Sequence, residues 1–253
     1  MKSLALRLLA AALCLVLLSS QALADASHFA LLGKDLGPCR RLTGSAYAIL
    51  VFVSTPAHPW TQKQKEAVYD ISWSSLDYIR ANAKKYRTDL DITYGCLDFS
   101  INTEYSRDLA WYWEIIHDEF HAQSIQQVYD YYKQTLQLDE APILFLFNSW
   151  DLSCTYMCKA DYPGWNEEFC VIFCDTQMHD HYLTHELYHL YGAIDLYDYS
   201  GEGVARIAHK YFGNCDMSCT SADVDDLTAY LIGWTDSLSA SAQGFLRETK
   251  GLR

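Results

Sequence analysis

Blocks of apolar residues separated by amphipathic stretches predict strands that alternate with helices. The run SAYAILVFVS, residues 45–54, is continuously apolar and rich in β-branched side chains, which is typical of a buried strand. LDITYGCLDFS at 90–100 and APILFLFN at 141–148 indicate two further strands. The short segments CTYMC and CVIFC, at 154–158 and 170–174, indicate two more.

Apolar residues at helical spacing predict the helices between these strands. From Thr61 to Tyr86 they recur on one face, and Thr61 is the expected N-cap. Residues 107–136 indicate a long second helix with an interruption, and residues 178–192 a third that ends near Gly192, a residue suited to a helix C-terminus. A last helix is expected within 221–234, capped by Ser221 or Asp223.

This order of elements predicts an α+β domain with α/β-type layering. The early strands are expected to be parallel, joined by helical crossovers, and the final helices to lie below the sheet. The length suits one domain with two lobes, which we place over 25–253, with an upper lobe at about 45–192 and a lower lobe at about 193–253.

Residues 1–24 have the pattern of a secretory signal peptide. Lys2 and Arg7 are basic, LLAAALCLVLL at 8–18 is an apolar core too short for a typical membrane span, and Ala22-Leu23-Ala24 is a small-residue cleavage site. The protein is therefore expected to be secreted or periplasmic. Its net charge of −13 disfavours nucleic acid and anionic membrane as partners.

Cysteine usage predicts disulfides. Nine cysteines are present, and Cys14 is lost with the signal peptide, which leaves an even number in an oxidising compartment. If the two short cysteine-bearing segments pair antiparallel, Cys154 with Cys174 and Cys158 with Cys170 fit one register. We therefore expect a disulfide-stapled domain.

The candidate chemistry lies in HELYHLYGAIDLYDY, residues 185–199. His185 and His189 are four residues apart, so a helix places them on one face, where both can bind one Zn²⁺. Glu186 can reach a water at that metal and act as a general base. Gly192 can turn the chain back, so that Asp195 supplies the third ligand that a catalytic zinc normally has.

Two alternatives stay open for the acidic residues after Gly192. Asp198, three residues beyond Asp195, could supply the third ligand instead, or support a ligand histidine from the second shell. Asp195, Asp198 and Glu202 could also bind calcium, although their spacing is not that of an EF-hand loop.

HELYHLYGAID resembles the zinc motif of the metzincin endopeptidases, H-E-x-x-H-x-x-G-x-x-H/D, in the form whose last ligand is aspartate. Snapalysin-like proteases and the immune-inhibitor-A group have this form. The resemblance covers His185 to Trp234. It implies a metzincin-like mixed sheet packed with two long helices, an active-site helix and a smaller C-terminal helical part. It also implies that Met217, in CDMSC, is the methionine of the turn beneath the metal.

We therefore expect a secreted zinc endopeptidase with one catalytic Zn²⁺ and a protein or peptide substrate. Glu186 would accept a proton from the attacking water and pass it to the leaving amine. The alternative is an exported, non-catalytic zinc-binding or interaction protein with the same fold. A hydrolase of a non-peptide amide would use the same residues. The oligomeric state is not indicated by the sequence.

Overall fold

The computed structural model describes residues 33–253, apart from 161, 163, 175–179, 199–202, 219–222, 251 and 253. The predicted signal peptide, 1–24, lies outside these residues. The strands are β1 (Gly44–Ser54), β2 (Leu90–Ser100), β3 (Ile143–Phe147), β4 (Cys154–Tyr156) and β5 (Phe169–Phe173). The helices are α2 (Gln62–Lys85), α3 (Ala110–Glu114), α4 (Ile125–Leu136), α5 (Asp180–Leu190), α6 (Val204–Phe212), α7 (Asp226–Leu231) and α8 (Ala240–Glu248), with a π-helical turn η1 (Ile115–Glu119) and a 3₁₀ turn η2 (Asp216–Ser218).

The strands form one mixed sheet in the order β2-β1-β3-β5-β4. β1 pairs in parallel with β2 and β3, and β3 pairs in parallel with β5, whereas β4 is antiparallel to β5 at the edge. Parallel neighbours require crossover connections. α2 connects β1 to β2 and the α3–η1–α4 segment connects β2 to β3, whereas loops and β4 lie between the parallel strands β3 and β5. The predicted layered α/β arrangement with parallel early strands is confirmed.

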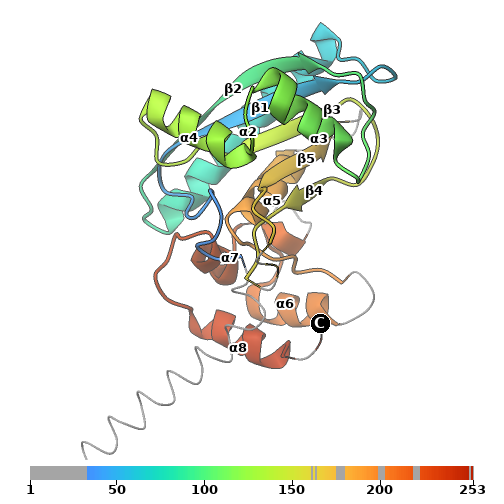
Figure 1. The fold of residues 1–253 in the computed structure, drawn as a ribbon. Coiled ribbons are helices and arrows are strands. Elements are labelled where there is room, and N and C mark those ends of the chain that lie inside the picture. Colours follow the sequence, from blue (N-terminus) through green and yellow to red (C-terminus); the bar gives the residue numbers. More distant parts are fainter. Residues whose placement is uncertain are drawn as a thin grey trace, which may run out of the picture.

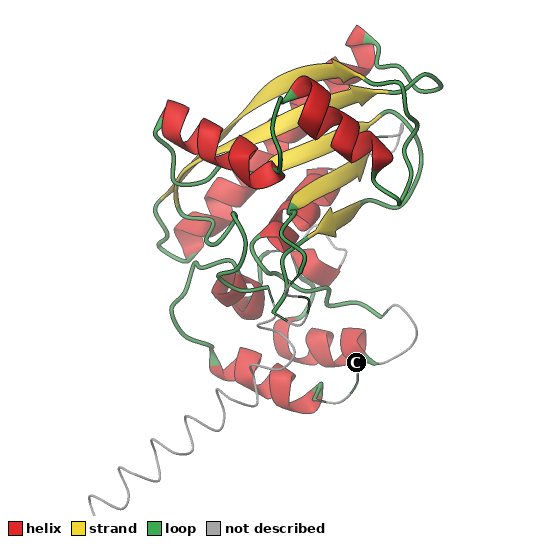
Figure 2. Ribbon diagram, viewed as in Figure 1, coloured by secondary structure: helices red, strands yellow, loops and turns green. Residues whose placement is uncertain are grey.

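Helices cover both faces of the sheet (Figures 1 and 2). On one face α2 and α5 pack against each other and against the strands. On the other, Trp111 of α3 packs edge-on against Phe145 and Phe147, with ring centroids 5.3 and 4.9 Å apart. Because side chains alternate along a strand, each central strand contributes to both cores. This explains why β3 and β5 are buried along their whole length.

Side-chain caps mark the starts of α2 and α7, whereas α3, α4 and α6 begin without one. Thr61 caps α2 in a capping box, accepting from the Gln64 amide while the Gln64 side chain accepts from the Thr61 amide, as predicted for the cap. The second helical stretch is interrupted, as expected: a π-helical turn follows α3, and α4 begins only at Ile125. The predicted caps of the last segment are wrong, since Asp225 caps α7, where its carboxylate accepts from the Leu227 and Thr228 amides.

Below α5, the helices α6, α7 and α8 form the lower part of the molecule in Figure 1. α6 and α8 pack against each other, and α7 contacts α8. Of these, α6 and α8 were not predicted from the sequence. Within the part of the chain that the structure describes, no helix is both long and apolar enough to span a bilayer.

The predicted disulfides are not formed, and this expectation is corrected. Among the seven cysteines that the structure describes, none is joined to another; Cys219 lies outside the described residues. β4 and β5 do pair antiparallel, but Cys154 is opposite Val171 rather than Cys174, a register three residues away from the predicted one. Thr155 is opposite Cys170, and Cys158 lies beyond the end of β4. The sheet and its apolar core, rather than disulfides, hold these strands together.

Candidate metal centre

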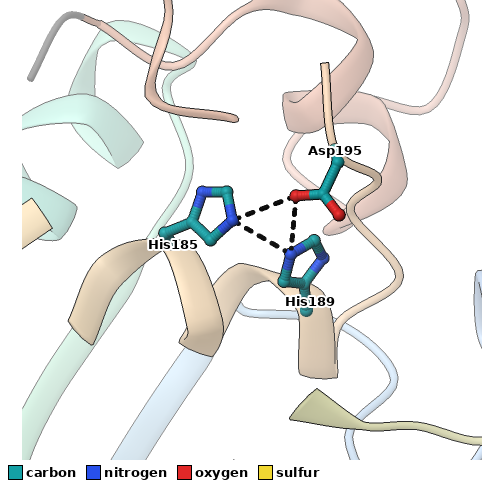
Figure 3. A group of neighbouring side chains, drawn as sticks. All are labelled: His185, His189 and Asp195. Carbon is teal, nitrogen blue, oxygen red and sulfur yellow. Dashed lines mark hydrogen bonds and ion pairs between the residues drawn. The ribbon is translucent and has the colours of Figure 1, made fainter. Parts of the chain in front are cut away.

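Helix α5 brings the two histidines together. One helical turn separates His185 from His189, and their Nε2 atoms are 3.2 Å apart (Figure 3). The two imidazole rings are nearly perpendicular, with centroids 4.7 Å apart. His185 is buried and His189 is partly buried, and the returning chain at 193–197 lies against both rings. The ring nitrogens therefore meet at a sheltered point rather than on an open helix face.

Gly192 turns the chain back towards these rings. Its φ of +91° is a left-handed value that glycine adopts without strain. The turn is also tightly packed, since a Cβ at this position would lie 2.9 Å from the carbonyl carbon of Gly33. Three residues later, Asp195 Oδ1 lies 3.1 Å from His185 Nε2 and 3.2 Å from His189 Nε2 (Figure 3).

The three donor atoms fit a tetrahedral zinc. They form a nearly equilateral triangle with sides of 3.1 to 3.2 Å. Ligands held about 2.05 Å from a tetrahedral zinc lie about 3.3 Å from one another. Two imidazole nitrogens and one carboxylate oxygen are also a donor set that zinc accepts. Among the described residues this is the one group of three or more His, Cys, Asp or Glu side chains that converges in this way.

The backbone orients the second histidine. His189 Nδ1 lies 2.8 Å from the Ala193 carbonyl oxygen, to which it can donate. A tautomer with the proton on Nδ1 makes this hydrogen bond and leaves the Nε2 lone pair available for a metal. Burial alone would lower the pKa of His189. The hydrogen bond to Asp195 and the negative charge of that carboxylate outweigh burial and raise the pKa of His189 to about 9. Asp195 thus favours a positive charge at the point where a cation can bind.

The structure separates the two candidate third ligands. Asp198 is exposed, and its Oδ1 accepts from the Ala205 amide at 3.0 Å, in the first turn of α6. It is not part of the converging group, so Asp195 is the better candidate. Glu202, which completed the alternative calcium site, lies outside the described residues.

Met217 lies in η2 and is fully buried. Its carbonyl oxygen accepts from the Leu196 amide at 2.8 Å. The turn that carries Met217 is therefore tied to the residue directly after Asp195. This contact supports the returning chain from which the third candidate ligand projects.

The candidate general base is also held in place. Glu186 is buried, and its Oε2 accepts from the Thr155 hydroxyl at 2.7 Å. Thr155 belongs to β4, thirty-one positions earlier in the chain. Sequence reasoning missed this residue, because only the fold brings the edge strand beside α5. Tyr197 was also missed. Its ring stacks on His185 with centroids 6.1 Å apart. Its position two residues after Asp195 was the feature of the sequence that could have indicated a place beside the candidate metal centre.

A second histidine pair does not form a comparable group. His117 lies in the π-helical turn and stacks on Trp113, with centroids 5.4 Å apart. His121 follows the end of that turn, with a left-handed φ of +53°. The two residues therefore do not share a helix face, although their spacing in the sequence allowed it.

Comparisons with known proteins add no assignment: no model of a known protein family matches the chain, and no curated protein matches it either.

Proposed function

We propose that this protein is an exported zinc-dependent endopeptidase. The observation that carries the proposal is the convergence of His185 Nε2, His189 Nε2 and Asp195 Oδ1 within 3.2 Å of one another, with the buried Glu186 next to the first histidine. Three protein ligands leave one position of a tetrahedral zinc for water, which is the arrangement of catalytic rather than structural zinc sites.

The residues of this site have distinct tasks. When bound, zinc polarises a carbonyl oxygen and lowers the pKa of a water to ~7. The Glu186 carboxylate accepts the proton of the attacking water and returns it to the nitrogen of the leaving amine. The Ala193 carbonyl keeps His189 in the tautomer that exposes Nε2, and the Tyr197 ring packs against the His185 imidazole.

The neighbouring sheet edge favours a peptide over a small amide as substrate. β4 ends the sheet, and its Thr155 contacts Glu186 directly. An extended chain can bind such an edge through main-chain hydrogen bonds, which would bring a peptide bond beside the glutamate. In the loop before β4, Trp150 and Leu152 expose 82% and 70% of their surface and offer apolar contacts to such a chain.

We further propose that the protein is metzincin-like. Four features support this: the mixed sheet with one antiparallel edge strand, the helix with both histidines, the glycine turn before Asp195, and the Met217 turn tied to Leu196. The signal-peptide pattern of residues 1–24 supports export to the secreted or periplasmic space.

The test combines metal analysis with cleavage of denatured casein and a broad peptide library. Wild-type protein should bind about one zinc and cleave, lose activity with a chelator, and regain it with zinc. Glu186→Gln should keep the zinc and lose about 10²- to 10⁴-fold in rate, since it removes the general base alone. Bound zinc without cleavage of any substrate would instead favour the non-catalytic zinc-binding protein.

A further inference from the structure

Thr155, at the centre of β4, contacts the candidate general base at two points. Its Oγ1 lies 2.7 Å from Glu186 Oε2 and 2.9 Å from the Glu186 carbonyl oxygen. Cys170 is opposite Thr155 in the β4–β5 register, so both side chains project from the same face of the sheet, towards α5. Two neighbouring strands thus contact the same residue of the helix.

The Thr155 hydroxyl has one proton to donate, and the surroundings direct it to the carboxylate. The Cys170 Sγ lies 3.1 Å from the Glu186 carbonyl oxygen and can donate to it. Burial raises the pKa of Cys170 well above its ordinary value, so the thiol keeps its proton. The carbonyl therefore has another donor, and the charged carboxylate is the stronger acceptor for the hydroxyl.

We propose that Thr155 is a positioning residue that holds the Glu186 carboxylate for proton transfer. This inference rests on the proposed function. A glutamate side chain has three rotatable bonds, and a fixed hydrogen bond to one oxygen restricts them. The same edge strand that would bind a peptide thus also orients the general base.

The kinetic test compares Thr155→Val, which removes the hydroxyl, with Thr155→Ser, which keeps it. On the library peptide that wild type cleaves fastest, Thr155→Val should lower kcat by about 10- to 100-fold, the value of a hydrogen bond to a charged group. KM and zinc content should stay within about twofold of wild type, since neither depends on the hydroxyl. Thr155→Ser should restore most of kcat.

A matched control is available in Thr103→Val. The Thr103 hydroxyl donates to Glu114 Oε2 at 2.6 Å, a similar threonine–glutamate hydrogen bond away from the candidate metal centre. This variant should leave kcat unchanged. In the Glu186→Gln background, Thr155→Val should have no further effect, because its partner has already been changed. A kcat for Thr155→Val within twofold of wild type, or additive effects in the double variant, would overturn the proposal.

Crystal structures of the zinc-free protein give a readout that does not depend on activity. Glu186 should keep one side-chain conformation in wild type and Thr155→Ser, and become disordered or rotate in Thr155→Val. An unchanged Glu186 in Thr155→Val would overturn the positioning role. A wild type that cleaves nothing would overturn the proposed function alone. If Thr155→Val does not fold, Thr155→Ala can replace it, because a comparison of Thr155→Ala with Thr155→Ser also tests the loss of the hydroxyl.

Discussion

At the scale of single residues, two aspartates three positions apart have different surroundings. Asp195 Oδ1 is within 3.2 Å of both histidines, whereas Asp198 satisfies an amide in the first turn of α6. We therefore expect Asp195→Ala to abolish stoichiometric zinc binding. Asp198→Ala should keep about one zinc and lose about 1 kcal/mol of stability, as for loss of a helix cap.

Metal analysis after dialysis, combined with thermal unfolding, distinguishes these outcomes. At a free zinc concentration at which wild type and Asp198→Ala both keep about one bound zinc, Asp195→Ala should have none. If zinc is retained by Asp195→Ala and lost by Asp198→Ala, the third ligand lies three residues further along the chain.

The candidate ligand residues could be identified from the sequence because they lie within eleven consecutive positions. A helix fixes the distance between His185 and His189, and a glycine turn limits where Asp195 can go. Thr155 has no such local relation to Glu186. Its contact depends on the position of β4 at the sheet edge, which comes from pairing with β5 and not from any pattern near Thr155.

At the scale of elements, the turn between α5 and Asp195 depends on the absence of a side chain at Gly192. Its left-handed φ would strain alanine, and a Cβ would also lie 2.9 to 3.0 Å from the backbone of Gly33 and Lys34. The left-handed φ alone should cost an alanine ~1–2 kcal/mol. With the added contacts, Gly192→Ala should lose about 3 kcal/mol or more of stability in total, and it should bind zinc more weakly.

Gly203→Ala is the matched control, because Gly203 has a similar φ of +80° and, among the described residues, nothing lies within 4 Å of the added Cβ. Gly203→Ala should lose only the stability that the left-handed backbone strain costs, and its zinc affinity should equal that of wild type. Denaturant unfolding and zinc titration measure both quantities. Equal losses in the two variants would show that the contact with the segment at Gly33 has no role in the turn.

The elements were predictable where one pattern dominated. Continuous apolar runs identified β1 and β3, and the capping sequence at Thr61 identified the start of α2. The β4–β5 register was not predictable, because both segments are short and each allows several pairings; the structure shifts it by three residues and removes the expected disulfides. α6 was missed because it follows a glycine rather than a polar cap that would indicate its start.

At the scale of the whole molecule, zinc should stabilise the fold by mass action. The three donors come from α5 and from the returning chain, so they converge only in the folded state. At 100 times the dissociation constant, zinc should add about 2.7 kcal/mol, which raises Tm by about 5–10 °C in a domain of this size. Calorimetry with zinc and with a chelator measures the shift. Asp195→Ala should show none, and an equal shift in that variant would mean that zinc binds elsewhere.

Stability should also fall as the pH rises, because of a buried carboxyl group outside the candidate metal centre. Glu168 is almost fully buried; its two oxygens accept from the Cys39 amide at 2.9 Å and the Cys158 amide at 3.3 Å. It thereby joins the N-terminal segment to the loop after β4. Burial is the main cause that raises the pKa of Glu168 to about 8, from 4.5 in an exposed glutamate, although both hydrogen bonds lower it.

The direction of this pH effect follows from the number of protons bound to the folded and unfolded chains. Between pH 4.5 and 8 the folded protein keeps a proton on Glu168 that the unfolded chain has lost, so folding stability decreases as the pH rises through this range. Glu140 acts in the same direction, since burial raises its pKa to about 7. Between pH 4.5 and 8, the free energy of unfolding should decrease by about 3–5 kcal/mol less in Glu168→Gln than in wild type, because glutamine does not titrate. Urea unfolding of the zinc-saturated proteins at a series of pH values measures the difference. Parallel curves for the two proteins would show that Glu168 is ionised in the folded state and that its two backbone hydrogen bonds outweigh the cost of burial.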